Sequence, residues 1–454
     1  MQALFLKAIA LNYFFAYFSL WLQYDGLYGS NGILPIKDFL ERFKNYKTYT
    51  LFNKNHSDKT VKAVALTGSL ISLLILSGFH HPILFLLLFA GYLSFVNVGQ
   101  DFLSFQWDTL LLEVGFITIF FSMQTPPPFL LTLSYWLLLF RFLFGSGYVK
   151  WVYGSREWRD LTAMCYHYET QPLPNRISFF MHQQPKWAGK LSTFLTYVFE
   201  MGVPFLYFLP SPFRFWGCVL SILFQLLIFM TGNFGFFNTL TIALCIPLLD
   251  LNTLPDWFQG ISLFHFESPI LTVVLSLIGA LFVALQLLRL IELFTPLAFT
   301  TKIKQKIAPF HILNSYGLFV HMTTSRDEIT IEGSDDNENW KPYTFKWKPG
   351  ALEAPPRQVA PYHPRLDWQM WFAALSGGSP PKWFDHLIVK LLQGSKQVLA
   401  LFKSNPFPDN PPKFIRAKID AYSFADSKKH RETKQWWVKK EGGFYFATVA
   451  LKEK

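Results

Sequence analysis

Long runs of apolar residues dominate the first 300 positions of the chain. Candidate helices lie at 4–24, 60–79, 82–98, 101–122, 128–145, 190–210, 212–231, 234–250 and 270–293. Most of these runs approach the roughly 20 residues that a helix needs to cross the apolar part of a bilayer. Proline- and glycine-rich breakers such as Pro210-Ser211-Pro212 separate them. The pattern predicts an α-helical polytopic membrane protein with about nine apolar helices.

The connections between these runs differ in length. The first run contains Lys7 and has no small-x-small cleavage site before Asp25, so we expect a retained helix and no cleaved signal peptide. Two connections, 25–59 and 146–189, are much longer than the others. The second includes CYHYETQPLPN at 165–175, where prolines and aromatic residues favour a fixed shape. We therefore expect a structured polar loop at 146–189 that docks a partner or covers a cavity.

The pattern changes after Thr300. No later run is long enough to span a bilayer, and alternating residues at 328–332 and 343–348 predict a hairpin around the turn-rich GSDDNEN. Runs at 414–424 and 436–446 predict further strands. Segments 364–375 and 381–403 are predicted to be helical, and Gly394 is predicted to interrupt the second. The chain thus divides into a transmembrane domain, 1–307, and a C-terminal soluble α+β domain, 308–454, which is large enough to be stable by itself.

Composition and charge agree with a membrane protein. Of the 454 residues, 51% are apolar and only 16% are charged, whereas a soluble chain carries about a quarter charged residues. The net charge is +11, many of the basic residues lie in loops that flank apolar runs, and no nucleic-acid-binding motif accompanies them. Membrane lipids are therefore expected partners and nucleic acids are not. The sequence does not fix the oligomeric state.

Polar residues interrupt the run at 101–122. On one continuous helix, Asp101 and Asp108 would share a face, and Gln106 and Glu113 would share another. Carboxylates at membrane depth cost a few kcal/mol unless they are paired or hydrated. One interpretation is a functional polar cavity with Arg141 of the next helix. The favoured interpretation places the first half of the helix at the interface and pairs Glu113 structurally.

The loop at 146–189 holds the other candidate binding residues. These are Trp158, Arg159, Asp160, His167, Tyr168 and Glu169. His-x-Glu alone is too sparse for a zinc site, and no HExxH, CxxC, phosphate-binding loop, GxGxxG or GxSxG motif occurs. We therefore predict no catalytic residue, metal or cofactor, and expect hydrogen bonds that order the loop. Arg159 should pair with a carboxylate other than Asp160, and Glu169 with His167 or with amides near Pro172.

Two aromatic stretches lie in the C-terminal part. HPRLDWQMWFAAL, at 363–375, places Trp368 and Trp371 beside an Arg-x-Asp. Such a stripe usually forms a domain core, but it could present an aromatic surface to a client protein. EGSDDNENW, at 332–340, lacks the ligand spacing of a calcium loop and predicts a turn followed by a core tryptophan.

Several long stretches together resemble the lipase maturation factor family. They are GLYGSNGILP at 26–35, FLSFQWDTLLLEVGF at 102–116, WRDLTAMCYHYETQPLPN at 158–175, NSYGLF at 314–319, IEGSDDNENWKPYTFKWKPG at 331–350, APYHPRLDWQMWFAAL at 360–375 and NPFPDNPPKFIRA at 405–417. The resemblance covers nearly the whole chain.

This resemblance implies a membrane-embedded folding factor. Such a protein helps secreted homodimeric lipases to fold, assemble and become active, and it acts as a chaperone without an established reaction of its own. The family is also similar to a group of membrane proteins that includes the vitamin K-dependent carboxylase. The alternative is therefore an integral-membrane enzyme that acts on a lipid-like or protein substrate in a polar intramembrane cavity.

The resemblance and the distribution of basic residues both indicate a cellular location. The resemblance implies the endoplasmic reticulum membrane with a lumenal C-terminal domain, or the cell inner membrane if the source is bacterial. Basic residues gather in loops 25–59 and 146–189, which nine helices would place on the same side as the C-terminal domain. By the positive-inside tendency that side is cytoplasmic. Because long loops weigh less in this tendency, we expect the extracytoplasmic placement.

Overall fold

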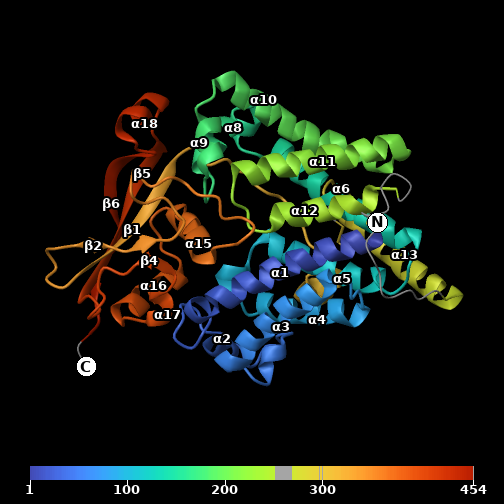
Figure 1. Cartoon of the computed structure of the whole chain (residues 1–454), viewed down its shortest axis with the longest axis horizontal. Helices are drawn as coiled ribbons and strands as arrows, with labels where there is room; N and C mark the ends of the chain where they lie inside the picture. Colours follow the sequence, from blue (N-terminus) through green and yellow to red (C-terminus); the bar gives the residue numbers. More distant parts are fainter. Residues whose placement is uncertain (251–267, 296, 299, 453–454) are drawn as a thin grey trace.

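The computed structural model describes residues 1–250, 268–295, 297–298 and 300–452. A helical bundle forms one end of the molecule, and a β-containing region packs against it at the other end (Figure 1). The longer bundle helices are α1 (Gln2–Leu27), α3 (Asp58–Leu76), α4 (Pro82–Val96), α5 (Gln106–Phe121), α6 (Phe129–Tyr153), α10 (Lys186–Tyr197), α11 (Ser211–Thr231), α12 (Phe237–Cys245) and α13 (Pro269–Ile291). Short helices α2 (Ile36–Arg42) and α14 (Thr300–Ile307) flank them.

Six of the helices described here are long and apolar enough to cross a membrane. They are α1, α3, α6, α10 with its π and 3₁₀ continuation to Phe208, α11 and α13. Helix α4 has 15 residues and α5 has 16. At 1.5 Å per residue they reach about 23–24 Å, less than the hydrocarbon thickness of about 30 Å. The chain is thus a multi-pass membrane protein with six candidate spans, and the expected count of about nine is not confirmed.

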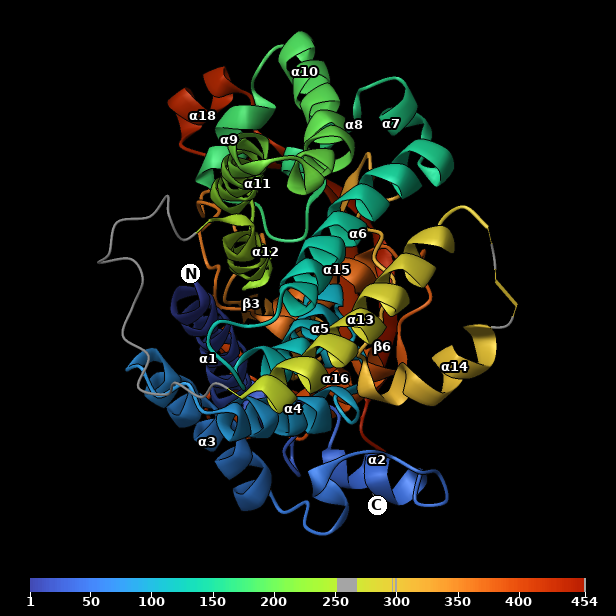
Figure 2. The ribbon, with the colours of Figure 1, turned by 90° about the vertical axis from the view of Figure 1, so that its right-hand side faces the viewer.

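Small residues let the bundle helices approach closely. Helix α1 packs on α3, and the ring of Tyr17 lies against Gly68 and Gly91, where a Cβ atom would clash. The Tyr17 hydroxyl donates to the carbonyl oxygen of Leu88 at 2.6 Å. Helix α13 lies along α6 (Figure 2), with Gly279 against the backbone of α6. Contact at glycine is the usual basis of helix association in membranes.

The long connection at 146–189 is helical over much of its length. Helix α6 continues through Gly145 and Gly147 to Tyr153, and three short helices follow. They are α7 (Arg156–Arg159), α8 (Ala163–Thr170) and α9 (Arg176–His182). A reciprocal capping box between Asn175 and Ser178 fixes the start of α9.

The C-terminal region contains a four-stranded antiparallel sheet in the order β2 (Lys341–Pro342), β1 (Arg326–Ser334), β5 (Phe414–Phe424) and β6 (Trp437–Ala450). Strands β3 (Thr344–Phe345) and β4 (Phe402–Ser404) form a second pair. The helices are α15 (Arg365–Ala374), α16 (Lys382–Leu392), α17 (Lys396–Leu399) and α18 (Ser427–Thr433). Gly394 ends α16 at φ +65°, a conformation that favours glycine.

The expected turn at 333–339 is present. The Asp336 carboxylate accepts from the backbone amides of Asn339 and Glu338 at 2.8 and 2.9 Å, and these bonds hold its pKa below the usual range. Trp340 is only half-buried, and its ring lies under the guanidinium of Arg416 at 3.9 Å at the edge of the sheet. It is therefore not the core tryptophan that the sequence suggested.

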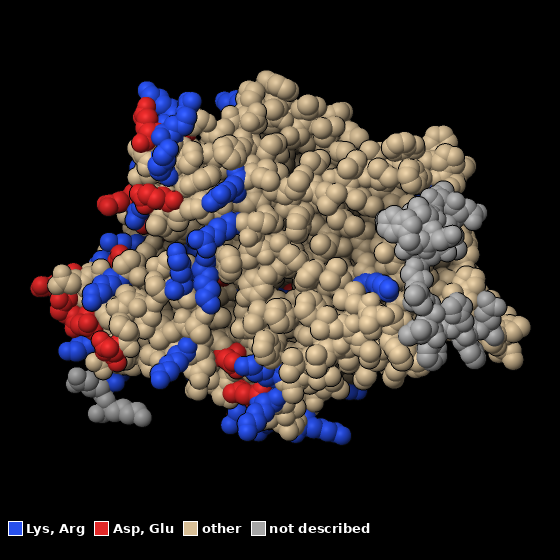
Figure 3. All heavy atoms as spheres, in the orientation of Figure 1, with Lys and Arg blue, Asp and Glu red and all other residues tan. Residues whose placement is uncertain are grey.

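The bundle and the C-terminal region share one hydrophobic core. A single cluster of buried side chains continues from α1 to β5. Trp383 of α16, for example, packs on Phe102 of the bundle with ring centres 5.4 Å apart. Charged side chains gather at the end of the molecule that the C-terminal region occupies, and much of the displayed bundle surface carries none (Figure 3). This distribution fits a bundle that faces lipid.

Candidate functional site

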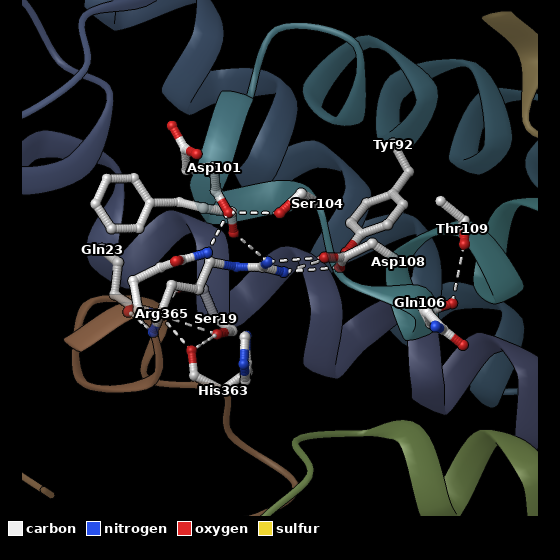
Figure 4. A network of polar contacts seen from close by, with 12 residues as sticks. Ser19, Gln23, Tyr92, Asp101, Ser104, Gln106, Asp108, Thr109, His363 and Arg365 are labelled. Atoms are coloured by element: carbon white, nitrogen blue, oxygen red, sulfur yellow. Dashed lines mark hydrogen bonds and ion pairs between the residues drawn. The ribbon is translucent and has the colours of Figure 1, made fainter. Parts of the chain in front are cut away.

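An ion pair between Asp108 and Arg365 joins the C-terminal region to the bundle. Both Asp108 oxygens accept from the guanidinium at 2.9 Å, and both side chains are 0% exposed. Arg365 also donates to the Phe102 carbonyl oxygen at 2.6 Å, and Asp108 accepts from the Tyr92 hydroxyl (Figure 4). The two terminal nitrogens of the guanidinium are hydrogen-bonded, while its buried Nε atom has no partner in the described part of the chain. Bidentate pairing of this kind offsets part of the cost of burying two charges.

The residues before Arg365 extend this contact. The His363 carbonyl oxygen accepts from Ser19 at 3.1 Å and from Gln23 at 2.9 Å, and the Arg365 amide donates to Gln23 at 2.9 Å. Ser19 and Gln23 lie on α1 (Figure 4). The segment 363–365 is therefore inserted among α1, α4 and α5 as a plug.

Asp101 and Asp108 do not share a helix face, and this expectation was wrong. The 3₁₀ helix η2 (Gln100–Leu103) ends before α5, and extended backbone at Phe105 separates the two. Asp101 is exposed while Asp108 is buried. Only the backbone carbonyl of Asp101 enters the network, where it accepts from Ser104 and Gln369.

Glu113 and Arg141 form a second buried pair. The expectation that these two side chains meet is confirmed, since Arg141 donates directly to Glu113. Glu113 also accepts from the Tyr316 hydroxyl at 2.7 Å and from the amide and side chain of Asn314 at 3.0 Å. These contacts join α5 and α6 to the chain that leaves the bundle, and the choice between a functional cavity and a structural pair stays a prediction.

The segment Asn314–Gly317 lies along one face of α5. Besides its bonds to Glu113, it exchanges two hydrogen bonds with Gln106, whose side chain contacts the carbonyl oxygen and the amide of Gly317 at 3.3 and 3.2 Å. Gln106 and Glu113 thus share a face as the helical period predicts. The segment that leaves the bundle, 314–317, therefore binds the face of α5 that carries Gln106 and Glu113.

The first three loop candidates have different surroundings. Trp158 is buried and donates from its indole to the Phe319 carbonyl oxygen at 2.8 Å. Arg159 and Asp160 are exposed. Asp160 accepts from the Thr162 amide at 3.1 Å and lies 3.7 Å from Arg156. Arg159 forms no ion pair with any carboxylate in the described ranges, contrary to our expectation, because α7 directs it to solvent.

Glu169 links the loop to the sheet. Its carboxylate accepts from the Phe424 amide at 2.7 Å and lies 3.3 Å from His182. The expected partners, His167 and the amides near Pro172, were wrong. The end of β5 lies beside this carboxylate and supplies the backbone amide that donates to it. Sequence reasoning could not have found Phe424, which is 255 positions away.

Arg326 binds three carbonyl oxygens of the loop, a contact that no sequence pattern indicated. From the start of β1 its guanidinium donates to the carbonyl oxygens of Glu169, Gln171 and Pro172 at 2.9, 2.5 and 3.0 Å. Glu328 balances its charge at 2.6 Å. Three carbonyls that converge on one guanidinium require a fixed backbone, and Pro172 helps to supply it.

Trp368 and Trp371 pack inside the molecule. Trp368 is 2% exposed, packs edge to face with Trp107 with ring centres 4.9 Å apart, and donates to the Asn233 carbonyl oxygen at 3.1 Å. Trp371 is half-buried and donates to the Thr170 carbonyl oxygen at 2.8 Å. Of the two interpretations of this stripe, the contacts match a core between loop, bundle and C-terminal region.

His167 and Tyr168 line a cavity under the loop. The cavity measures about 390 Å³ and is bordered mainly by apolar side chains of α6, α8, α10, α11 and α12. His167 contacts the ring of Phe319 at 5.1 Å. Burial, with a smaller contribution from the nearby Lys150 ammonium, lowers the pKa of His167 to about 4. Among the described residues, no group of His, Cys, Asp and Glu could hold a metal ion.

Known proteins resemble this chain along almost its whole length. Residues 1–256 match the lipase maturation factor transmembrane domain, and residues 312–447 match the lipase maturation factor C-terminal domain. The chain is 32% identical to lipase maturation factor 2 of Homo sapiens, with 99% of this chain and 82% of the relative covered. It is 33% identical to lipase maturation factor 1 of Mus musculus, with 99% and 87% covered. No solved structure is a significant match.

Proposed function

The chain belongs to the lipase maturation factor family, and we propose that it is a membrane-embedded maturation factor for lipases. One observation carries this proposal. The similarity to proteins named lipase maturation factors covers 99% of the chain and includes both of the family's domains.

The finer proposal concerns place and action. We propose that the protein resides in the endoplasmic reticulum membrane, with its C-terminal region in the lumen, and acts as a chaperone for secreted dimeric lipases. Its architecture supports this role, because the buried Arg365–Asp108 pair would hold the C-terminal region in a fixed orientation above the membrane. A fixed surface loses less conformational entropy when a partner binds.

The stretch 151–160 is the candidate client surface. Trp151 and Tyr153 expose more than half of their surface, and Arg159 and Asp160 beside them are also exposed. Tryptophan, tyrosine and arginine are enriched at binding hot spots. Trp158 is buried within this stretch, so it would position the surface and would not touch the client.

Co-expression with a secreted dimeric lipase tests the proposal. The intact protein should raise the specific activity of the lipase and not only its amount. Arg159→Ala should keep normal expression and lower activation, whereas Lys37→Ala, at an exposed residue of α2, should activate as the unaltered chain does. If no dimeric lipase gains specific activity, the proposed function is wrong.

A further inference from the structure

The cavity beneath α8 has the size of a small-molecule site. Its volume of about 390 Å³ lies within the range of about 300–1,000 Å³ that such sites occupy. Helices from two distant parts of the chain form its walls, since α6 and α8 face α11 and α12. The volume is therefore enclosed by the tertiary fold of the bundle.

The mouth of the cavity is apolar. Four lining side chains are also exposed at the surface: Ile177, Leu195, Leu227 and Met230. Leu195, Leu227 and Met230 belong to candidate membrane spans. The entrance is therefore open to the hydrocarbon of a bilayer. Met164 and Met181 add unbranched side chains to the lining, and these can adapt to a flexible chain.

The inner wall is polar but carries no net charge. Lys150 and Glu200, both buried, neutralise one another with Nζ–O distances of 2.6 and 2.7 Å. Asn238 donates to Gln225 at 2.9 Å. The Asn238 Oδ1 atom is buried and accepts from no donor in the described part of the chain. Because buried acceptors are normally hydrogen-bonded, the Asn238 Oδ1 atom favours a ligand in this cavity that donates a hydrogen bond.

We propose that this cavity binds a single-chain membrane lipid with an uncharged, hydroxylated head group. The acyl chain would lie among the methionine and leucine side chains, and a hydroxyl would donate to Asn238 Oδ1. A carboxylate head group would offer no donor to that oxygen and would compete with Glu200 for Lys150. This inference does not depend on the proposed action on lipases.

The test uses the full chain in phosphatidylcholine nanodiscs with a photoreactive probe. The probe is a monoacylglycerol that carries a diazirine in its acyl chain. After irradiation, labelled peptides should come from 164–181 and 224–238. Unlabelled monoacylglycerol should compete. A fatty acid probe of the same chain length should label these peptides more weakly.

Variants separate cavity binding from surface labelling. Ile228→Trp fills the cavity and should abolish labelling, whereas Leu223→Trp, exposed on the same helix outside the lining, should not change it. Asn238→Leu should weaken probe binding about threefold to tenfold, as expected for one lost hydrogen bond. If Ile228→Trp does not fold, Leu227→Trp at the mouth replaces it.

Two outcomes would overturn the inference. Labelling that survives in the folded filling variant would show that the probe marks only the lipid-facing surface. Stronger labelling by the fatty acid probe, lost in Lys150→Met, would show that the cavity takes an anionic ligand.

Discussion

At the scale of single residues, buried charge pairs hold segments that lie far apart in the sequence. Asp108 and Arg365 are separated by 257 positions, and Glu113 and Arg141 by 28. The second pair could be predicted, because the two residues lie in consecutive apolar runs. The first could not, because nothing in the periodicity of HPRLDWQMWFAAL indicates that its arginine enters the bundle. Arg326 escaped prediction for the same reason.

The Asp108–Arg365 pair gives a prediction about stability. Arg365→Met leaves Asp108 buried without its cation, which should lower the free energy of unfolding by about 3–5 kcal/mol. Arg365→Met combined with Asp108→Leu should recover part of this loss. The measurement is thermal or denaturant unfolding of the purified protein in detergent.

The control is Lys37→Met in the pair Lys37–Glu41, whose side chains are 56% and 62% exposed. Exposed pairs contribute at most about 1 kcal/mol, so this variant should unfold nearly as the unaltered protein does. A small effect of Arg365→Met would mean that the plug does not hold the two parts together.

His167 gives a prediction about pH. Its pKa is lowered to about 4 in the folded protein, against about 6.5 in the unfolded chain. Between these values the unfolded state binds more protons, so stability falls as pH decreases. From pH 7 to pH 5 this residue should cost about 1–2 kcal/mol of stability. His167→Gln should remove this contribution. The measurement is the free energy of unfolding of the unaltered protein and of the variant at pH 7 and at pH 5, and the loss between the two pH values should be smaller in the variant by this amount. If both proteins lose the same stability between pH 7 and pH 5, a group other than His167 causes the pH dependence.

At the scale of elements, the sequence predicted the C-terminal region better than the membrane part. Strand β5 occupies 414–424 as alternation indicated, and the break at Gly394 separates α16 from α17. In the bundle, apolar composition could not distinguish a full span from a shorter buried helix. The two pieces of 100–121 are largely enclosed by the bundle and the C-terminal region, and this burial depends on contacts between distant segments. Helix α4 is also buried on one side, but it exposes Ile83, Leu86 and Leu87.

Arg326 gives a prediction about the loop. Arg326→Met removes the donor to three loop carbonyls, and charged hydrogen bonds of this kind contribute about 1.5–3 kcal/mol each. Amide hydrogen exchange in 169–182 should therefore become at least about tenfold faster. Exchange in α1 and α6 should not change. Arg431→Met, at an exposed arginine of α18, is the matched control. If amide exchange in the loop does not change, its prolines and helix caps are sufficient to order it without Arg326.

At the scale of the whole molecule, contacts place the long loops and the C-terminal region together. Ser395 donates to the Asn31 carbonyl oxygen at 2.9 Å, and Asn97 bonds to both Tyr49 and Pro309. Loop 25–59 and the C-terminal region therefore share one side of the bundle. Their basic residues favour the cytoplasm by the positive-inside tendency. The proposed chaperone role requires the lumen. A chemical modification that occurs in one compartment alone decides between these two placements.

Glycosylation supplies that chemistry, because the acceptor sequence Asn-x-Ser/Thr is modified only in the lumen. The chain has one natural acceptor, Asn55-His56-Ser57, and Asn55→Gln removes it. Lys341→Thr then creates a single acceptor at Asn339, which is exposed in the hairpin between β1 and β2. Expressed with microsomes, this double variant should gain one glycan that endoglycosidase H removes. Asn55→Gln with Lys341→Ala should gain none. An unmodified double variant that protease cuts from the cytosolic side would place the C-terminal region in the cytosol, where it could not meet a secreted lipase.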